Sequence, residues 1–270
     1  MDLVDLHVHT DASDGRYSPD RVLELAGALG LRAVAFADHD TMAGFLAAPA
    51  DRTVELVPAV EVKADFLGRE VHVLGYFLDP ARLDFLARDR EARDWRNREM
   101  VARMQADGVS ISMAALQARR PGRIIGRPHM AALLVEQGLF PDTAAAFSAW
   151  LGEGGRYYVP RPRQTLAQAA MDIRAAGGKA VLAHPLQYAL SPDLLRRLAR
   201  ECRECGFSGL EAIYSGYSPD QTAMLTALAG SLGLCVTGGS DYHGPQRPGF
   251  PLGGVPVPYA LLARLREAAV

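Results

Sequence analysis

The sequence predicts an α/β fold with a mainly parallel β-sheet, closed or open, that a helical insertion interrupts. Short β-rich runs alternate with longer helical patterns along most of the chain, and this alternation is typical of parallel sheets. Hydrophobic residues make up 49% of the 270 residues, which is enough for a sizeable core. The length fits one large barrel domain or two ordinary domains.

The candidate strands are short runs rich in apolar and β-branched residues, and turn residues bound them. They lie at 2–8, 33–37, 54–60, 70–77, 180–183, 209–213 and 234–238. Each candidate helix begins at Asp, Ser, Thr or Pro, and several end at Gly, which are typical helix starts and stops. These helices lie at 19–29, 165–176, 191–205 and 219–232.

The stretch from about residue 86 to residue 158 breaks the alternation of strands and helices. It begins with one long amphipathic helix at 86–107, and further helical segments are expected near 128–138 and 142–151. We therefore expect a first barrel portion, a helical insertion that acts as a lid or substrate domain, and a second barrel portion. Their expected bounds are 1–85, 86–158 and 159–270.

Arginine is unusually frequent around the start of this insertion. The window 82–127 holds eleven Arg against six Asp or Glu. One interpretation is a solvated helix face with pairs between residues four apart. The alternative is a lid that carries positive charge over an anionic substrate.

The overall composition excludes several classes of protein. The formal net charge of −2 argues against a protein that coats long nucleic acid by bulk attraction. The chain has no run of 18 apolar residues and no signal-peptide pattern, so no membrane association is expected. Its three cysteines do not make a disulfide framework, and we expect a cytoplasmic protein.

Ionisable residues gather at the ends of the candidate strands. Six of the seven histidines fall within or just after a strand, with carboxylates beside them. Burying so many ionisable groups is costly unless something pairs with them, and the ends of barrel strands converge on one site. The pattern therefore predicts a metal cluster. Its candidate ligands are His7, His9, Asp14, His39, Glu61, His72, His184, Asp241 and His243.

Local spacing supports a metal site. His7 and His9 are two residues apart on a strand, so both project to the same face about 7 Å apart. Asp241 and His243 repeat this spacing after the last strand, whereas His72 falls inside its strand. Mixed imidazole and carboxylate ligands suit Mn²⁺, Fe²⁺ or Zn²⁺ better than Mg²⁺ or Ca²⁺.

Several short motifs follow one another in a specific order. They are DLHVHTDASDG at 5–15, DHDT at 38–41, Glu61, His72, AHP at 183–185 and GSDYHG at 239–244. This ordered set closely resembles the polymerase-and-histidinol-phosphatase (PHP) family over the full length of the chain. GRPH at 126–129, together with the insertion after the fourth strand, resembles the branch that acts on nucleoside 3′,5′-bisphosphates and short RNA 5′ ends.

The resemblance implies a distorted (β/α)7 TIM-like barrel, the PHP fold, with two to three divalent ions. The implied ligands of the first ion are His7, His9, Glu61 and Asp241. Glu61 would bridge to a second ion, whose other implied ligands are His72 and His184. A third ion, which makes the site trinuclear, would be held by Asp14, His39 and His243. Ala37 and Tyr242 replace the Thr and Phe common in this branch, but neither change removes a donor.

The charge of such a site suits a phosphate monoester. Three divalent ions and three carboxylates leave about +3, which a phosphate dianion would neutralise in part. Metal binding lowers the pKa of water from 15.7 to about 7, so we expect a metal-activated hydroxide to attack phosphorus in line. A second ion would stabilise the leaving oxygen.

Residues of the GRPH motif are candidates for contacting the substrate. Arg127 is suited to gripping phosphate, and His129 is also a candidate proton donor to the leaving group. The alternative interpretation is a surface arginine and a helix-capping histidine. Arg161 is a further candidate for phosphate, with Tyr157 or Tyr158 as a base-stacking partner.

We therefore expect a metal-dependent phosphoesterase whose substrate is a nucleotide or a short oligonucleotide, with short-RNA 5′-exonuclease activity included. One alternative is histidinol-phosphate phosphatase, which shares the barrel and the metals. Another is a non-catalytic, metal-stabilised PHP module that binds a partner such as a polymerase. No protein partner is indicated by the sequence.

Overall fold

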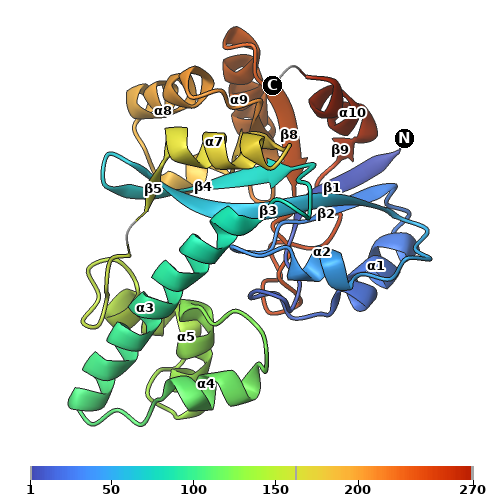
Figure 1. Cartoon of the computed structure of the whole chain (residues 1–270). Coiled ribbons are helices and arrows are strands. Elements are labelled where there is room, and N and C mark those ends of the chain that lie inside the picture. Colours follow the sequence, from blue (N-terminus) through green and yellow to red (C-terminus); the bar gives the residue numbers. More distant parts are fainter. Residues whose placement is uncertain (1, 162, 269–270) are drawn as a thin grey trace. The chain divides into compact units, whose positions relative to one another are not determined.

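A nine-stranded sheet organises the chain in this computed structural model, which describes residues 2–161 and 163–268 (Figure 1). The strands stand in the order β8-β7-β6-β4-β3-β2-β1-β9, and β5 pairs with β3 off this path. Their bounds are β1 (Leu3–Val8), β2 (Ala33–Phe36), β3 (Glu55–Phe66), β4 (Arg69–Tyr76), β5 (Gln164–Thr165), β6 (Lys179–Leu182), β7 (Gly209–Tyr214), β8 (Cys235–Gly239) and β9 (Val257–Pro258). All seven predicted strands are present, and β5 and β9 were not predicted.

The sheet curves until its two ends almost meet. The backbone N–H of His9, just past β1, donates to the carbonyl of Tyr242, just past β8, at 2.8 Å. Val8 also forms an isolated parallel bridge with Tyr242. The predicted α/β barrel is thus confirmed as a distorted, nearly closed one.

The direction of β4 differs from a purely parallel barrel. This strand runs antiparallel to β3 and to β6, while β1, β2 and β3 are mutually parallel and so are β6, β7 and β8. An antiparallel strand begins at the edge of the sheet where its parallel neighbours end. His72, near the start of β4, therefore lies at the same end of the barrel as residues that follow the parallel strands.

The chain divides into two compact units, Met1–Leu83 with Arg163–Val270, and Asp84–Pro162. Helices of the first unit lie around the outside of the barrel (Figure 1). They are α1 (Pro19–Ala28), α2 (Ala43–Ala47), α7 (Leu166–Ala175), α8 (Pro192–Glu204), α9 (Pro219–Ser231) and α10 (Tyr259–Glu267), with the 3₁₀ turn Pro185–Tyr188 after β6. Side chains of Ser18, Thr165, Ser191 and Ser218 accept backbone N–H groups and so cap four of them. Helices α2 and α10 were not predicted.

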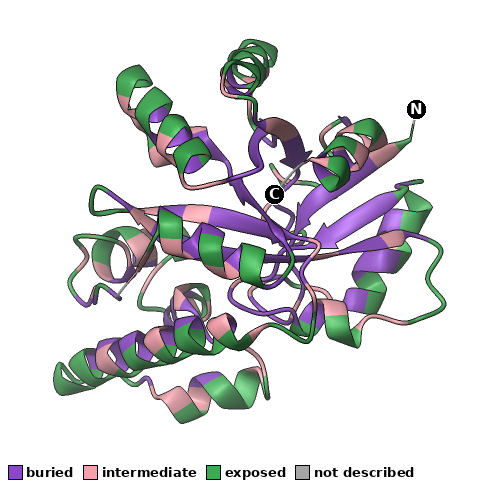
Figure 2. Ribbon diagram, turned by 45° about the horizontal axis from the view of Figure 1, so that its top comes forward, coloured by how far each residue is buried: buried purple, intermediate pink, exposed green. Residues whose placement is uncertain are grey.

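The second unit is helical. It contains α3 (Asp84–Ala106), α4 (Met113–Arg119), α5 (Arg127–Glu136), α6 (Thr143–Ala146) and a π-helical turn at Phe147–Leu151. One face of α3 is buried and the other is exposed (Figure 2). The buried face contributes Met100 and Met104 to a core that also contains Leu116, Met130 and Leu134. No helix among the described residues is both long and apolar enough to span a bilayer.

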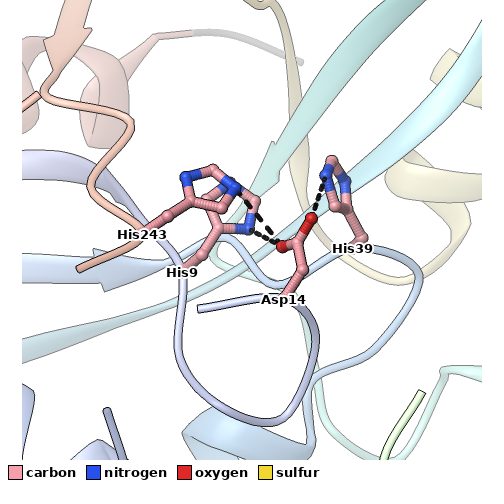
Figure 3. Close-up of side chains that lie close together, drawn as sticks. All are labelled: His9, Asp14, His39 and His243. Carbon is pink, nitrogen blue, oxygen red and sulfur yellow. Dashed lines mark ion pairs between the residues drawn. The ribbon is translucent and has the colours of Figure 1, made fainter. Parts of the chain in front are cut away.

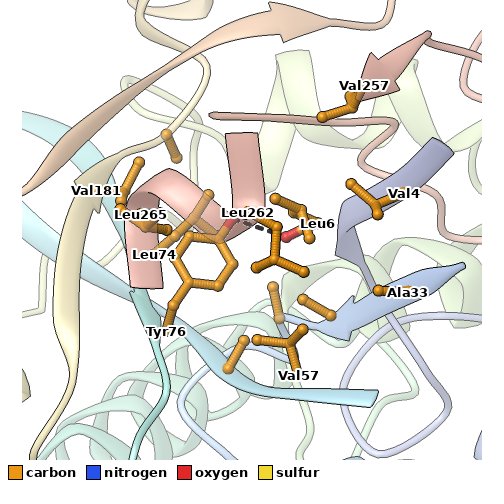
Figure 4. Close-up of a cluster of buried hydrophobic side chains, with 14 residues drawn as sticks. Val4, Leu6, Ala33, Val57, Leu74, Tyr76, Val181, Val257, Leu262 and Leu265 are labelled. Atoms are coloured by element: carbon orange, nitrogen blue, oxygen red, sulfur yellow. Dashed lines mark hydrogen bonds between the residues drawn. The ribbon is translucent and has the colours of Figure 1, made fainter. Parts of the chain in front are cut away.

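The main core of the barrel unit gathers side chains from most of its strands. Leu6, Leu74, Tyr76 and Val181 are among its fully buried members, and α10 adds Leu262 and others (Figure 4). The Tyr76 hydroxyl donates to the carbonyl of Leu6 at 2.8 Å, so this buried phenol has a partner. Helix α10 therefore completes the hydrophobic core of the barrel unit.

Candidate metal centre

The nine candidate ligands predicted from sequence come together in the barrel unit. They belong to β1, β3 and β4 or to the segments just after β1, β2, β6 and β8. Atoms suited to metal binding lie within 4.8 Å of one another in four overlapping groups. The groups are His9, Asp14, His39 and His243; His7, Glu61 and His184; His7, His9 and Asp241; and His39, Glu61 and His72.

Glu61 is the carboxylate that joins these groups. Its Oε1 lies 2.7 Å from His72 Nδ1 and 3.1 Å from His184 Nε2. Its Oε2 lies 2.9 Å from His39 Nδ1 and 3.4 Å from His9 Nε2. Because each oxygen faces different imidazoles, this side chain has the geometry of a bridging ligand.

Asp14 is the centre of the largest group (Figure 3). One of its oxygens lies 3.6 Å from His9 Nδ1 and 3.3 Å from His243 Nε2, and the other lies 3.6 Å from His39 Nε2. Two ligand atoms that each lie about 2.1 Å from one ion at a tetrahedral angle are about 3.4 Å apart. The spacing of the group therefore leaves room for an ion between its members.

Unsatisfied buried atoms test whether these residues fit a metal. His7 Nε2 and both ring nitrogens of His9 are buried without a hydrogen-bond partner in the described part of the chain. Buried polar atoms are otherwise almost always hydrogen-bonded. Divalent ions would coordinate His7 Nε2 and one ring nitrogen of His9, whose other nitrogen carries the proton of the neutral ring, so the residues present fit such ions.

Electrostatics couples the protonation states of the ligands to one another. Burial by itself would raise the carboxylate pKa values, but neighbouring imidazoles outweigh it and hold the pKa of Glu61, Asp14 and Asp241 well below the usual range. Burial, with His243 and His39 nearby, lowers the pKa of His9 to about 3. The carboxylates are thus ionised and His9 is neutral, as metal ligation requires. Nearby carboxylates, in contrast, outweigh burial and raise the pKa of His7 and, to about 9, that of His72, so an ion would have to displace a proton from each.

Two buried aspartates hold the loops that carry the ligands. Asp38 accepts hydrogen bonds from the backbone and hydroxyl of Thr10, at 2.8 and 2.6 Å, and from the Ser13 hydroxyl at 2.6 Å. Asp5 accepts from the backbone of Ser240 at 2.8 Å and of Gly253 at 2.9 Å. These bonds fix the segment after β1 and the segment after β8.

Sequence reasoning missed several residues that contact the ligands, Glu211 and Tyr214 among them. Glu211 on β7 lies 3.1 Å from His7 Nδ1, and the Tyr214 hydroxyl donates to Asp241 Oδ2 at 2.7 Å. The available signal was weak: Glu211 is the one charged residue in the otherwise apolar run GLEAI.

The candidate substrate residues Arg127, His129, Tyr158 and Arg161 all belong to the second unit. The Arg127 guanidinium lies 5.6 Å from the centre of the Tyr158 ring, whereas buried Arg161 donates to the carbonyl of Asp89 at 3.1 Å. The structure thus brings Arg127 and Tyr158 together.

His129, the third residue of α5, contributes to the cap of that helix. Its Nδ1 accepts the backbone N–H of Gly126 at 2.9 Å. A neutral imidazole that accepts at Nδ1 carries its proton on Nε2. The capping interpretation and the proton-donor interpretation of this histidine are therefore compatible.

The fold and the site together define a metal-dependent phosphoesterase, and comparisons with known proteins agree. The PHP domain family matches residues 5–95. The chain is 34% identical over 253 residues to the 5′-3′ exoribonuclease Rnm of Escherichia coli (strain K12). The aligned region covers 90% of this chain and 86% of that relative. The chain is 32% identical over 257 residues to the 3′,5′-nucleoside bisphosphate phosphatase of Chromobacterium violaceum, spanning 93% and 90% of the two chains.

A solved structure is similar over almost the whole chain. It is a crystal structure of a protein assigned as a metal-dependent phosphoesterase from Bifidobacterium adolescentis, with a TM-score of 0.87 and 32% identity over 99% of this chain and 96% of that one. The chain belongs to the PHP family, and the resemblance seen in its motifs is confirmed. It is a hydrolase, so the non-catalytic scaffold interpretation is not supported.

Proposed function

We propose that this phosphoesterase hydrolyses phosphate esters of nucleotides, namely nucleoside 3′,5′-bisphosphates, short 5′-phosphorylated oligoribonucleotides, or both. The observation that carries the proposal is the convergence of six histidines and three carboxylates at one end of the barrel. The names of two relatives, an exoribonuclease and a bisphosphate phosphatase, support the nucleotide class. We place the activity in the cytoplasm.

We assign the ligands of two to three divalent ions, Mn²⁺, Fe²⁺ or Zn²⁺, as follows. His7, His9, Glu61 and Asp241 hold the first. Glu61, His72 and His184 would hold the second, because both imidazoles face the same oxygen of Glu61. Asp14, His39 and His243 hold the third, in agreement with their common group.

Divalent ions at this site supply Lewis acidity and lower the pKa of water. The chain itself contributes charge, shape and orientation. Tyr214 orients Asp241 through its 2.7 Å hydrogen bond, and Asp5 and Asp38 fix the ligand-bearing loops. With neutral imidazoles the nine ligands carry a charge of −3, so a site filled with ions attracts the phosphate dianion.

We assign substrate binding to the helical insertion. Arg127 binds a phosphate, and Tyr158, whose ring lies beside it, stacks on the base. His129 donates the Nε2 proton to the leaving oxygen, and Arg161 adds positive charge.

The substrate assignment is tested by comparing three compounds on one metal-loaded preparation. Phosphate release from adenosine 3′,5′-bisphosphate and stepwise digestion of a short 5′-phosphorylated RNA are measured with Mn²⁺ present, beside histidinol phosphate. We expect kcat/KM for a nucleotide substrate to exceed that for histidinol phosphate by at least about 10²-fold, or ~2.7 kcal/mol. The reverse order would identify a histidinol-phosphate phosphatase. Inactivity toward all three, with stoichiometric metal bound, would contradict the nucleotide assignment.

Replacement of His129 by asparagine separates capping from proton donation. Asparagine keeps an acceptor close to the position of Nδ1 but has no equivalent of the Nε2 proton. We expect kcat to fall by about 10²-fold with Tm almost unchanged, because general acid catalysis contributes about 10²–10⁴-fold. His129→Ala, the control, removes the cap as well and lowers Tm. Wild-type kcat in His129→Asn would rule out the proton-donor role.

A further inference from the structure

We propose that Glu211 is a positioning residue of the metal centre, which fixes the tautomer of His7 and the backbone of His184. Glu211 lies on β7 and is fully buried. It is outside all four groups of candidate ligands among the described residues. The inference depends on the ligand assignment made above.

The contact with His7 determines which ring nitrogen can bind a metal. Both oxygens of Glu211 approach His7 Nδ1, at 3.1 and 3.3 Å, across 204 residues of sequence. The carboxylate accepts from Nδ1, so Nδ1 carries a proton and Nε2 is the ring nitrogen left to bind an ion. His7 Nε2 is the atom that faces the cluster, 3.6 Å from Glu61 and 3.5 Å from Asp241. This arrangement matches the carboxylate–histidine–metal triads of metalloenzymes.

The contact with His184 holds a strained turn. The backbone of this residue has φ 22° and ψ 59°, in the left-handed region that residues other than glycine rarely adopt. Glu211 Oε2 accepts the backbone N–H of His184 at 2.7 Å, a short bond to a carboxylate oxygen. Tyr217 accepts the N–H of Leu186 at 2.9 Å further along the same turn. The carboxylate therefore holds the turn at the residue whose side chain faces Glu61.

One buried carboxylate thus ties together a ligand on β1 and a ligand in the turn after β6. His7 belongs to two of the four groups and His184 shares one of them, so their positions must agree to a few tenths of an ångström. Glutamine has the size of glutamate but one oxygen acceptor instead of two. With its oxygen at the position of Oε2 it keeps the bond to His184 and the 3.3 Å contact with His7, but its amide then replaces Oε1 and turns a donor toward His7 Nδ1 at 3.1 Å.

The test compares Glu211→Gln with Glu55→Gln. Glu55 is the control because it begins β3, bonds Tyr259 at 2.8 Å, and contacts no candidate ligand among the described residues. Metal content is measured by mass spectrometry after dialysis, and the dissociation constant for Mn²⁺ by competition with a chelating dye. We expect Glu211→Gln to bind at least one ion about 10–100-fold more weakly, with unchanged circular dichroism, and Glu55→Gln to bind normally.

A second measurement uses the unaltered protein and does not depend on the folding of a variant. Nitrogen-15 NMR of the Zn²⁺-loaded protein, with the His7 signal assigned through His7→Asn, is expected to show a proton on Nδ1 and none on Nε2. Unchanged Mn²⁺ affinity in folded Glu211→Gln, or a proton on His7 Nε2, would overturn the inference. Failure of the wild-type chain to bind any divalent ion would instead overturn the ligand assignment on which the inference rests.

Discussion

Replacement of Glu61 by glutamine is expected to lower kcat/KM by at least about 10³-fold, or ~4 kcal/mol of transition-state stabilisation. Both carboxylate oxygens lie within 3.4 Å of imidazole nitrogens, from His72 and His184 on one side and from His39 and His9 on the other. An amide replaces one of these acceptors by a donor and removes the negative charge. We therefore expect the protein to lose at least one divalent ion, measured by mass spectrometry beside the steady-state rates.

The matched control is Glu55→Gln on the same strand. Glu55 and Glu61 both belong to β3, but Glu55 begins the strand, far from the end where the candidate ligands gather. It contacts Tyr259 and Arg266 instead. Its replacement is expected to leave metal content and kcat/KM within about twofold of the wild-type values, because Glu55 is partly exposed and contacts no candidate ligand among the described residues. Full activity in Glu61→Gln with normal metal content would remove the central role of this carboxylate.

Strand positions were predictable from sequence where the strand is a short apolar run bounded by turn residues. The first strand, predicted at 2–8, runs from Leu3 to Val8, and the last, predicted at 234–238, runs from Cys235 to Gly239. The third was predicted to end at residue 60, yet β3 continues to Phe66. Its later residues include charged Glu61 and Lys63, which resemble the start of a loop. Pairing with β4 keeps them in the strand.

The antiparallel direction of β4 was not predicted for the same reason. Only two residues, Leu67 and Gly68, separate β3 from β4, and both have positive φ, at 53° and 80°. A two-residue connection of this kind makes a hairpin and so an antiparallel pair. With β3 predicted six residues short, the hairpin was not recognisable, and His72 remained an exception among the candidate ligands.

The site was predictable as a set of ligands but not as an arrangement. Ordered motifs identified nine residues that the structure brings together. Residue type and spacing do not reveal Glu211, because its partners His7 and His184 lie in distant segments, β1 and the turn after β6, and the bond to His184 involves only a backbone N–H. Such supporting contacts require coordinates.

A methyl group added at Gly239 is expected to disrupt the barrel where β8 meets β1. An alanine Cβ at this position would lie 2.4 Å from the backbone nitrogen of His7 and 2.5 Å from its Cβ. The main chain of β1 cannot move aside as a flexible side chain would. We expect Gly239→Ala to destabilise the protein by about 3 kcal/mol, at the upper end of ordinary overpacking, and to lower Tm by roughly 6–12 °C.

The comparison with Gly230→Ala separates a steric effect at the seam of the barrel from a general effect of alanine. Gly230 lies in α9, where an added Cβ meets no atom within 4 Å among the described residues. Alanine in a helix is favoured over glycine by about 0.5–1 kcal/mol, so this variant is expected to raise Tm slightly. Because the clash at Gly239 falls on His7 itself, Gly239→Ala should also weaken Mn²⁺ binding. A Gly239→Ala protein with wild-type Tm and metal affinity would show that β1 and β8 do not approach so closely.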